Sequence, residues 1–135
     1  IEGHRCVIVW DKGETMYGRS FSECETAEAS FNEVSRIVKI PPNQFDKIHP
    51  TQKPVALYKW LLSRYAKPGD RILDTHGGSG SICIACHDLG YDLTWMELDA
   101  DYYKAAVARY QNHAAQASLF DPVELTREAR EGELF

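Results

Sequence analysis

Long hydrophobic runs are absent from this sequence. Its apolar stretches fall far short of the ~20 residues that a transmembrane helix requires, and no secretory signal is present. Cysteine is sparse, with four residues at unequal spacing, which argues against a disulfide framework or a zinc site in a chain that is not exported. We therefore expect a cytoplasmic protein that binds no metal and does not enter a membrane.

What the sequence does contain is typical of an ordinary globular protein. Of its 135 residues, 44% are hydrophobic and 26% are charged, a composition close to the average for folded domains. A chain of this length fits a single domain with a core of its own. We expect that domain to span residues 1–115 and to be followed by an acidic, loosely attached tail over residues 116–135.

Basic residues are concentrated in the middle of an acidic chain. The formal net charge is −5, yet residues 36–71 hold eight lysines and arginines and two aspartates, which gives a local charge of +6. Two interpretations stay open. The block faces nucleic-acid phosphates, with Arg36, Lys39 and Lys47 as its candidates, or it is the solvated face of a helix and a loop.

The first third of the chain predicts short strands. Residues 6–10 form an apolar, β-branched run that is typical of a buried strand, and residues 14–22 predict a loop. Residues 24–31 and 34–40 alternate and predict two further strands. We expect those two strands to pair with each other as an antiparallel hairpin, with Asn32 and Glu33 in its turn.

The remainder of the chain alternates between helices and strands. Residues 54–65 have helical spacing and 68–70 end that helix. A strand over 71–74, a helix over 81–88 and a strand over 93–97 follow. A last helix is expected to begin at Asp99 or Asp101 and to end near His113. This order predicts an α/β fold with parallel strands.

A glycine-rich turn at residues 74–80, Asp-Thr-His-Gly-Gly-Ser-Gly, is the first candidate for a functional site. Such a turn between a strand and a helix gathers backbone N–H groups and a helix N-terminus at one point. Glu97 ends the next strand and can accept hydrogen bonds from both hydroxyls of a ribose. A dinucleotide motif would need a third glycine where Cys83 stands, which argues against a nicotinamide or flavin enzyme.

Three longer runs give the turn a more specific meaning. They are Lys-Ile-His-Pro-Thr-Gln-Lys-Pro-Val at 47–55, Tyr-Ala-Lys-Pro-Gly-Asp at 65–70 and Ile-Leu-Asp-Thr-His-Gly-Gly-Ser-Gly-Ser at 72–81. Shorter matches are Val-Trp-Asp-Lys-Gly at 9–13, Glu-Cys-Glu at 23–25 and Glu-Leu-Asp at 97–99. In these runs the chain resembles the β-group of DNA amino-methyltransferases, of phage and prophage type, over about residues 5–113.

The resemblance implies a Rossmann-like α/β/α sandwich with a mixed sheet, and S-adenosyl-L-methionine as the cofactor. The expected reaction transfers a methyl group to the exocyclic amine of adenine, or with less support cytosine, in double-stranded DNA of a bacterial or phage-infected cell. The target base first leaves the duplex stack. The residues that match the family's cofactor motifs are Thr51, Lys53, Pro54, Asp74, Gly77, Gly78, Gly80, Glu97 and Asp99.

The family's catalytic motif is missing from the chain. That motif, Asp/Asn/Ser-Pro-Pro followed by an aromatic residue, holds the target amine and stacks on the base. The one Pro-Pro pair, at 41–42, has neither flanking residue and lies in the wrong place. The resemblance thus implies the C-terminal part of a catalytic domain, with unknown catalytic residues and an upstream half or a second copy as partner. The alternative is a non-catalytic methylase remnant or subunit that binds cofactor or DNA.

Two other motifs have an ordinary structural interpretation. Cys-Ile-Ala-Cys-His at 83–87 formally matches a haem attachment pattern, but it falls inside a predicted helix, so we expect buried helix cysteines. His76 is interpreted as a residue that shapes the turn rather than as a base.

The tail contains a separate candidate for partner binding. Residues 116–120 resemble the peptide by which bacterial proteins bind the replication sliding clamp, with Gln116, Leu119 and Phe120 as the matching residues and Ala117 as a departure. Two interpretations stay open here as well. The peptide binds a clamp groove in an extended form, or its apolar residues pack back on the domain.

Overall fold

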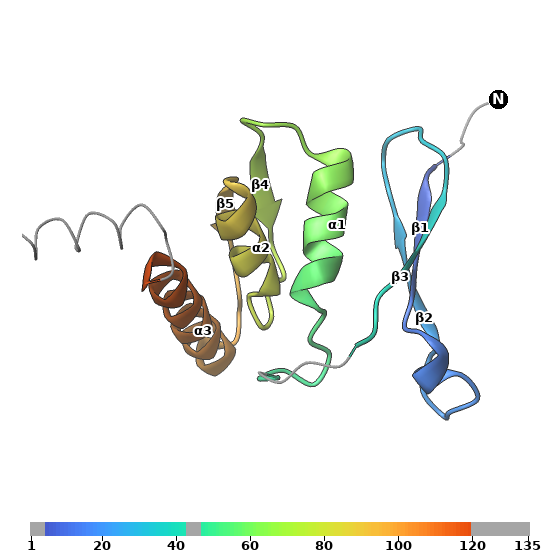
Figure 1. Cartoon of the computed structure of the whole chain (residues 1–135), viewed down its shortest axis with the longest axis horizontal. Coiled ribbons are helices and arrows are strands. Elements are labelled where there is room, and N and C mark those ends of the chain that lie inside the picture. Colours follow the sequence, from blue (N-terminus) through green and yellow to red (C-terminus); the bar gives the residue numbers. More distant parts are fainter. Residues whose placement is uncertain (1–4, 43–46, 120–135) are drawn as a thin grey trace, which may run out of the picture.

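The computed structural model describes residues 5–42 and 47–119, with side chains up to residue 116. Two sheets and three α-helices make up this part of the chain (Figure 1). One sheet contains β1 (Val7–Asp11), β2 (Cys24–Glu28) and β3 (Arg36–Lys39), and the other contains β4 (Arg71–Asp74) and β5 (Asp92–Trp95). The helices are α1 (Val55–Tyr65), α2 (Ser81–Leu89) and α3 (Ala100–Leu119), with a short 3-10 helix at Glu14–Met16.

The first sheet is mixed, and β1 lies at its centre. β1 pairs antiparallel with β2 and parallel with β3. The predicted hairpin between the second and third strands is therefore wrong, because both strands flank β1 instead of each other. The physical reason is burial: β1 carries the buried side chains Ile8 and Trp10, whereas most residues of β2 and β3 are exposed. The most apolar strand takes the protected central position.

The second sheet confirms the predicted parallel arrangement. β4 and β5 pair in parallel from Arg71 opposite Asp92 to Asp74 opposite Trp95, with α2 as the connection between them. α2 buries Ile82, Ala85 and Cys86, as its spacing predicts. Gly90 follows its last residue with φ +77°, a left-handed conformation that glycine adopts without steric cost.

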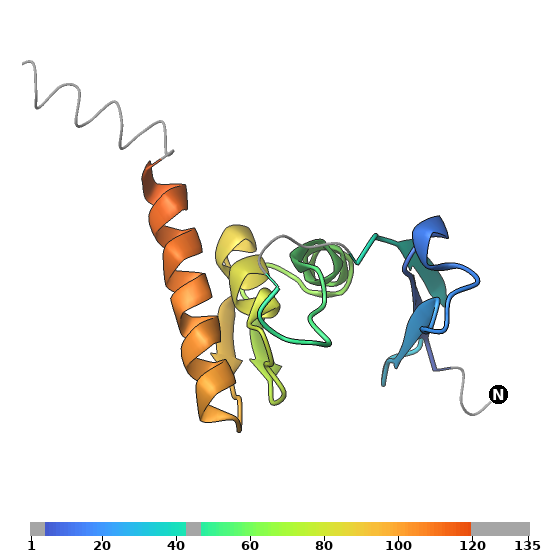
Figure 2. The same cartoon turned by 90° about the horizontal axis from the view of Figure 1, so that it is seen from below.

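Helix α1 lies between the two sheets in both views (Figures 1 and 2). Its residue Leu57 belongs to the hydrophobic cluster of the first sheet, together with Cys6, Ile8, Trp10 and Val38. Leu62, only five positions later, belongs to a second cluster with Ile82, Ala85 and Cys86 of α2. One short helix therefore contributes to both hydrophobic cores.

Helix α3 starts where the sequence predicts and ends later. The Asp99 carboxylate accepts the backbone N–H groups of Asp101 and Tyr102, both at 2.9 Å, so Asp99 rather than Asp101 caps the helix. The helix continues to Leu119 instead of ending near His113, because residues 114–117 are Ala-Ala-Gln-Ala, all strong helix formers. α3 thus crosses the predicted boundary at residues 115 and 116. Within the described residues, no helix is long and apolar enough to span a membrane.

Asp88, near the end of α2, ties the three helices together. It contacts Lys59 Nζ of α1 at 2.6 Å and His113 Nε2 of α3 at 2.7 Å, with His87 Nδ1 at 3.3 Å. Burial raises the pKa of Asp88, but the hydrogen bonds from Lys59, His113 and His87 outweigh it and lower the pKa to about 2. The charged carboxylate therefore stabilises the fold above its ordinary pKa of 3.8, and this contribution is lost as the pH falls toward 2.

We predict that Asp88→Asn lowers the free energy of unfolding at pH 7 by about 1 kcal/mol, a value discounted for solvent screening because the side chain is 21% exposed. The gap between wild type and variant should narrow as the pH falls from about 4 toward 2. Urea unfolding across this pH range measures it. Asp92→Asn on β5 serves as the control, and a gap that does not depend on pH would contradict the assignment.

Candidate functional site

The glycine-rich turn follows β4 and is hydrogen-bonded to the segment that follows β5. Parallel strands end at the same edge of a sheet, so these two segments meet there. Met96 N–H donates to the carbonyl of Asp74 at 2.9 Å, and Gly77 N–H donates to the carbonyl of Met96 at 2.8 Å. Gly78 and Gly80 have φ of +54° and +73°, the left-handed conformation for which glycine is preferred.

Gly77 is required for a different reason, which is space. A Cβ placed on Gly77 would lie 1.5 Å from Nε1 of Trp95, the last residue of β5. The Trp95 ring is stacked on Tyr103 of α3, with centroids 5.0 Å apart. Its buried Nε1 has no hydrogen-bond partner among the described residues. The turn can therefore close over β5 only because residue 77 has no side chain.

Glu97 holds the turn from the other side. Its Oε2 accepts Gly78 N–H at 2.7 Å, and its Oε1 accepts Asp99 N–H at 2.9 Å. The backbone hydrogen bonds from Asp99 and Gly78 lower the pKa of Glu97, so the group is a carboxylate at neutral pH. A carboxylate has about four lone-pair sites, so Glu97 keeps acceptor capacity for a ligand beyond the backbone N–H groups that it already accepts.

Arg109 supports the turn from α3, a role that the motifs do not indicate. Its Nη1 donates to the carbonyl of Ser79 at 3.2 Å and to Oγ of Ser81 at 2.8 Å. Both serines are buried. The signal in the sequence is weak, because an arginine on a predicted helix face ordinarily points to solvent.

The loop that precedes α1 is also fixed in place. Nδ1 of His49 accepts Thr51 N–H at 3.2 Å and lies 3.1 Å from Thr51 Oγ1, and the His49 ring lies against Tyr102 of α3 with centroids 4.3 Å apart. Gln52 is buried, and its Oε1 accepts Ile48 N–H at 2.9 Å. Pro54 is the N-cap of α1.

A cavity of about 240 Å³ lies between this loop and the glycine-rich turn. Five of the predicted cofactor residues line it: Thr51, Lys53, Gly77, Gly78 and Glu97. The other four lie next to it, since Asp74 and Gly80 belong to the turn, Pro54 starts α1 and Asp99 caps α3. Cavities of about 310 to 540 Å³ lie elsewhere, but none of the predicted cofactor residues lines them.

Two further cavity residues are His76 and Tyr58. His76 Nδ1 lies 2.9 Å from Thr75 Oγ1, and its backbone N–H donates to Asp74 Oδ1 at 2.9 Å, contacts that agree with a residue that shapes the turn. Burial raises the pKa of Tyr58 to about 12, with a smaller contribution from the charge of Asp74. Tyr58 therefore presents a neutral phenol.

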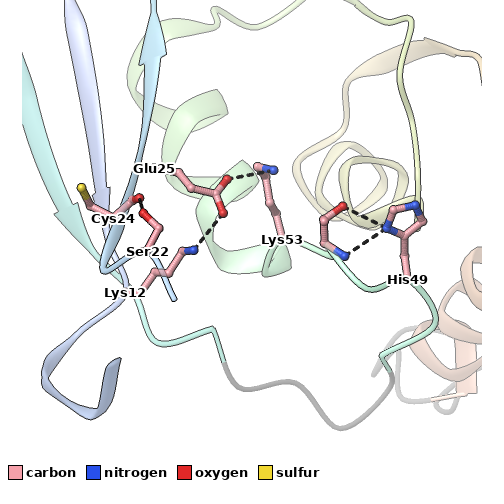
Figure 3. A network of polar contacts seen from close by, with 7 residues as sticks. Lys12, Ser22, Cys24, Glu25, His49 and Lys53 are labelled. Atoms are coloured by element: carbon pink, nitrogen blue, oxygen red, sulfur yellow. Dashed lines mark hydrogen bonds and ion pairs between the residues drawn. The ribbon is translucent and has the colours of Figure 1, made fainter. Parts of the chain in front are cut away.

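An ion-pair network reaches the cavity from the first sheet (Figure 3). Lys53 Nζ lies 3.1 Å from Oε2 of Glu25 on β2, and Oε1 of Glu25 lies 3.0 Å from Nζ of Lys12, the residue after β1. The sequence matches at 9–13 and 23–25 include Lys12 and Glu25 but assign them no place in a site. Neither is adjacent to Lys53 in the chain, so sequence spacing alone gives no sign of their contact.

The structure does not gather the predicted DNA-binding residues on one surface. Arg36 and Lys39 lie on β3, where Lys39 Nζ pairs with Glu14 Oε1 at 3.0 Å. Lys47 lines a different cavity, beside Arg109 and His113 of α3. The assignment of these three residues to DNA stays a prediction.

The remaining motifs can be placed only in part. The Cys-Ile-Ala-Cys-His run lies in α2, where Cys86 is buried and burial raises the pKa of the Cys83 thiol to about 11. Gln116 is exposed on α3 and Leu119 is its last residue, so this part of the clamp-like peptide is helical rather than extended. Phe120 lies outside the described residues, and clamp binding stays a prediction.

Comparison with solved structures defines the class of protein. The fold is similar to that of the crystal structure of the M1.HpyAVI–SAM complex, with a TM-score of 0.60 and 27% identity over 76% of this chain and 60% of that one. Together with the mixed sheet and the parallel β4–β5 pair, this identifies the fold as part of the Rossmann-like α/β fold of methyltransferases.

Sequence comparison then gives the family. The family model described as DNA methylase matches residues 2–108, and the chain belongs to this N6/N4 DNA methylase family. It is 34% identical over 67 residues to the type II methyltransferase M.HpaI of Haemophilus parainfluenzae, which covers 50% of this chain and 21% of that protein. It is 36% identical over 61 residues to YubD of Escherichia coli K12, named as a methylase, covering 45% and 27% respectively. The matched part is thus about a quarter of the length of these relatives.

We predict that Gly77→Ala destabilises the protein by about 1–3 kcal/mol, because the added methyl group overlaps the indole of Trp95. Replacement of Trp95 by leucine should remove most of that penalty. Urea unfolding of the single variants and of Gly77→Ala/Trp95→Leu forms a double-mutant cycle. Strictly additive effects would show that the two positions do not interact.

Proposed function

We propose that this chain forms the S-adenosyl-L-methionine site of a DNA amino-methyltransferase. The observation that carries the proposal is the cavity that joins the glycine-rich turn, the loop at residues 49–53 and the Glu97 carboxylate. Motif residues as far apart in the sequence as His49 and Glu97 line this one cavity. The M1.HpyAVI structure, a relative in fold, was solved as a SAM complex.

The charges around the cavity suit two parts of this cofactor, its ribose and its carboxylate. Glu97 offers free lone pairs for the hydroxyls of a ribose, as acidic residues do at this position in nucleotide-binding α/β folds. Lys53 offers a cation to the cofactor's carboxylate. At about 240 Å³ the cavity is smaller than the ~300–1,000 Å³ of a typical ligand pocket. It therefore suits the part of the cofactor nearest the glycines.

The chemistry that the bound cofactor supplies is a methyl group on a sulfonium. Transfer of that methyl group to an exocyclic amine would leave the cofactor's sulfur as a thioether, with the electron pair of the broken carbon–sulfur bond, and would release one proton from the amine. The residues of this chain hold and orient the cofactor for that step and exclude water around it. We propose adenine rather than cytosine in double-stranded DNA as the target, on the phage-like resemblance of the motifs.

A second candidate function follows from the missing catalytic tetrapeptide. No Pro-Pro-aromatic sequence occurs in the 135 residues, so the motif that holds the target amine in the family either lies outside this sequence or is missing from the protein. In the first case the chain works with an upstream segment or a second subunit. In the second case it is a non-catalytic cofactor-binding or DNA-binding subunit.

Calorimetric titration with S-adenosyl-L-methionine tests the site. We expect the wild-type chain to bind, and Glu97→Gln to raise the Kd about tenfold, because an amide replaces one of the acceptor oxygens. Glu33→Gln, an exposed glutamate between β2 and β3, makes the same change of charge away from the cavity and should bind like wild type. Absence of binding by the wild type, or equal weakening in both variants, would contradict the proposed site.

A methyl-transfer assay tests whether this chain alone can hold a target amine. With labelled S-adenosyl-L-methionine and double-stranded DNA, we expect the chain alone to incorporate no label above background, because it lacks the catalytic tetrapeptide. An intact adenine methyltransferase is the positive control. Label in DNA treated with this chain alone would show that other residues hold the target amine, and digestion to nucleosides would then identify the base.

A further inference from the structure

Lys53 is the cationic side chain of the candidate cofactor cavity, and its position depends on a residue of another sheet. The side chain is long, flexible and 38% exposed. Left alone, such a lysine samples many rotamers. Here its Nζ is held 3.1 Å from Glu25 Oε2.

Glu25 is itself held from behind by Lys12. Lys12 Nζ lies 3.0 Å from Glu25 Oε1, and the Lys12 side chain is only 13% exposed. The ammonium group also lies 5.4 Å from the ring centroid of Trp10, whose side chain is buried. Ion pairing and contact with an aromatic face together fix this charge. Lys12 is therefore a rigid anchor, in contrast to Lys53.

The backbone of the first sheet sets the geometry of this anchor. Glu25 lies opposite Trp10 in the β1–β2 register, and Lys12 N–H donates to the carbonyl of Glu23 at 3.0 Å. Burial raises the pKa of Glu25, but the hydrogen bonds from Lys12 and Lys53 outweigh it and lower the pKa. The carboxylate is therefore charged at neutral pH, and it has one oxygen for each lysine.

We propose that Glu25 is a positioning residue of the cofactor site: it holds the Lys53 ammonium at the lip of the cavity and fixes it to the first sheet through Lys12. The inference rests on the proposed function, since it assumes that the cavity holds S-adenosyl-L-methionine. It goes further by assigning a role to a residue that does not line the cavity. In this proposal Trp10 contacts Lys12, Lys12 holds Glu25, Glu25 holds Lys53, and Lys53 faces the ligand.

A double-mutant cycle on cofactor affinity tests the proposal. Titration of the 135-residue chain with S-adenosyl-L-methionine should show that Glu25→Gln raises the Kd about tenfold, and that Lys53→Met raises it by at least as much. In the Lys53→Met background, Glu25→Gln should have no further effect, because Glu25 acts only through Lys53. Glu28→Gln, at the other end of β2, is the matched control and should bind like wild type.

Thermal melting of each variant distinguishes positioning from general destabilisation. Glu25 is 41% exposed, so its replacement should leave the Tm close to that of wild type. If Glu25→Gln does not fold, Glu25→Asp, which keeps the charge but shortens the reach by one methylene, completes the same cycle. A residue with a purely structural role would weaken binding equally in the presence and absence of Lys53.

Three results would overturn the inference. Two of them leave the proposed function standing, and one overturns it as well. A wild-type affinity in Glu25→Gln would overturn the inference alone, as would an equal loss from Glu25→Gln in both Lys53 backgrounds. Failure of the wild-type chain to bind S-adenosyl-L-methionine would overturn the proposed function and the inference with it. Coupling between the two positions, with unchanged melting, supports the assignment.

Discussion

The hydrogen bond from Gly78 N–H to the Glu97 carboxylate is the constraint on which the candidate site depends. It holds the turn after β4 to the segment after β5, at the edge where two parallel strands end together. The left-handed glycines let the chain reach that position. The missing side chain of Gly77 leaves room for Trp95. The same carboxylate has further acceptor capacity, and we propose that the group which holds the turn also binds the ribose of the cofactor.

Sequence reasoning succeeded where the determinants are local in the chain. The glycine-rich turn, the spacing of Ile82, Ala85 and Cys86, and the Asp99 cap depend on residues within a few positions of each other, and the structure agrees with them. Sequence reasoning failed where a strand or side chain contacts residues that are distant in the sequence. The strands near Cys24 and Arg36 look like a hairpin, but competition for the apolar β1 decides their pairing. Likewise, no spacing rule connects Lys12 or Arg109 with the site.

The described residues contain the cavity that we propose as a cofactor site, and the sequence lacks the motif expected to hold a target base. The chain belongs to the DNA methylase family, so in our proposal the cavity corresponds to the family's cofactor part and the missing motif to its catalytic part. The matched part is a minor fraction of the length of M.HpaI and YubD. The bridge formed by Lys12, Glu25 and Lys53 shows, in addition, that the cofactor cavity is not independent of the first sheet. If the cavity holds the cofactor as we propose, the arrangement of β1 and β2 contributes to the position of one of its lining residues, Lys53.

Helix α1 has a consequence for how the protein unfolds. A two-stranded sheet is marginal as an independent unit unless it packs against a helix. Here the two sheets belong to separate hydrophobic clusters, and both clusters include residues of α1, a helix of about three turns. Leu57 loses its packing if the first sheet opens, and Leu62 loses its packing if the second does. If either core unfolds, apolar side chains of α1 become exposed, and the other core packs against this same helix. We therefore expect α1 to couple the unfolding of the two cores.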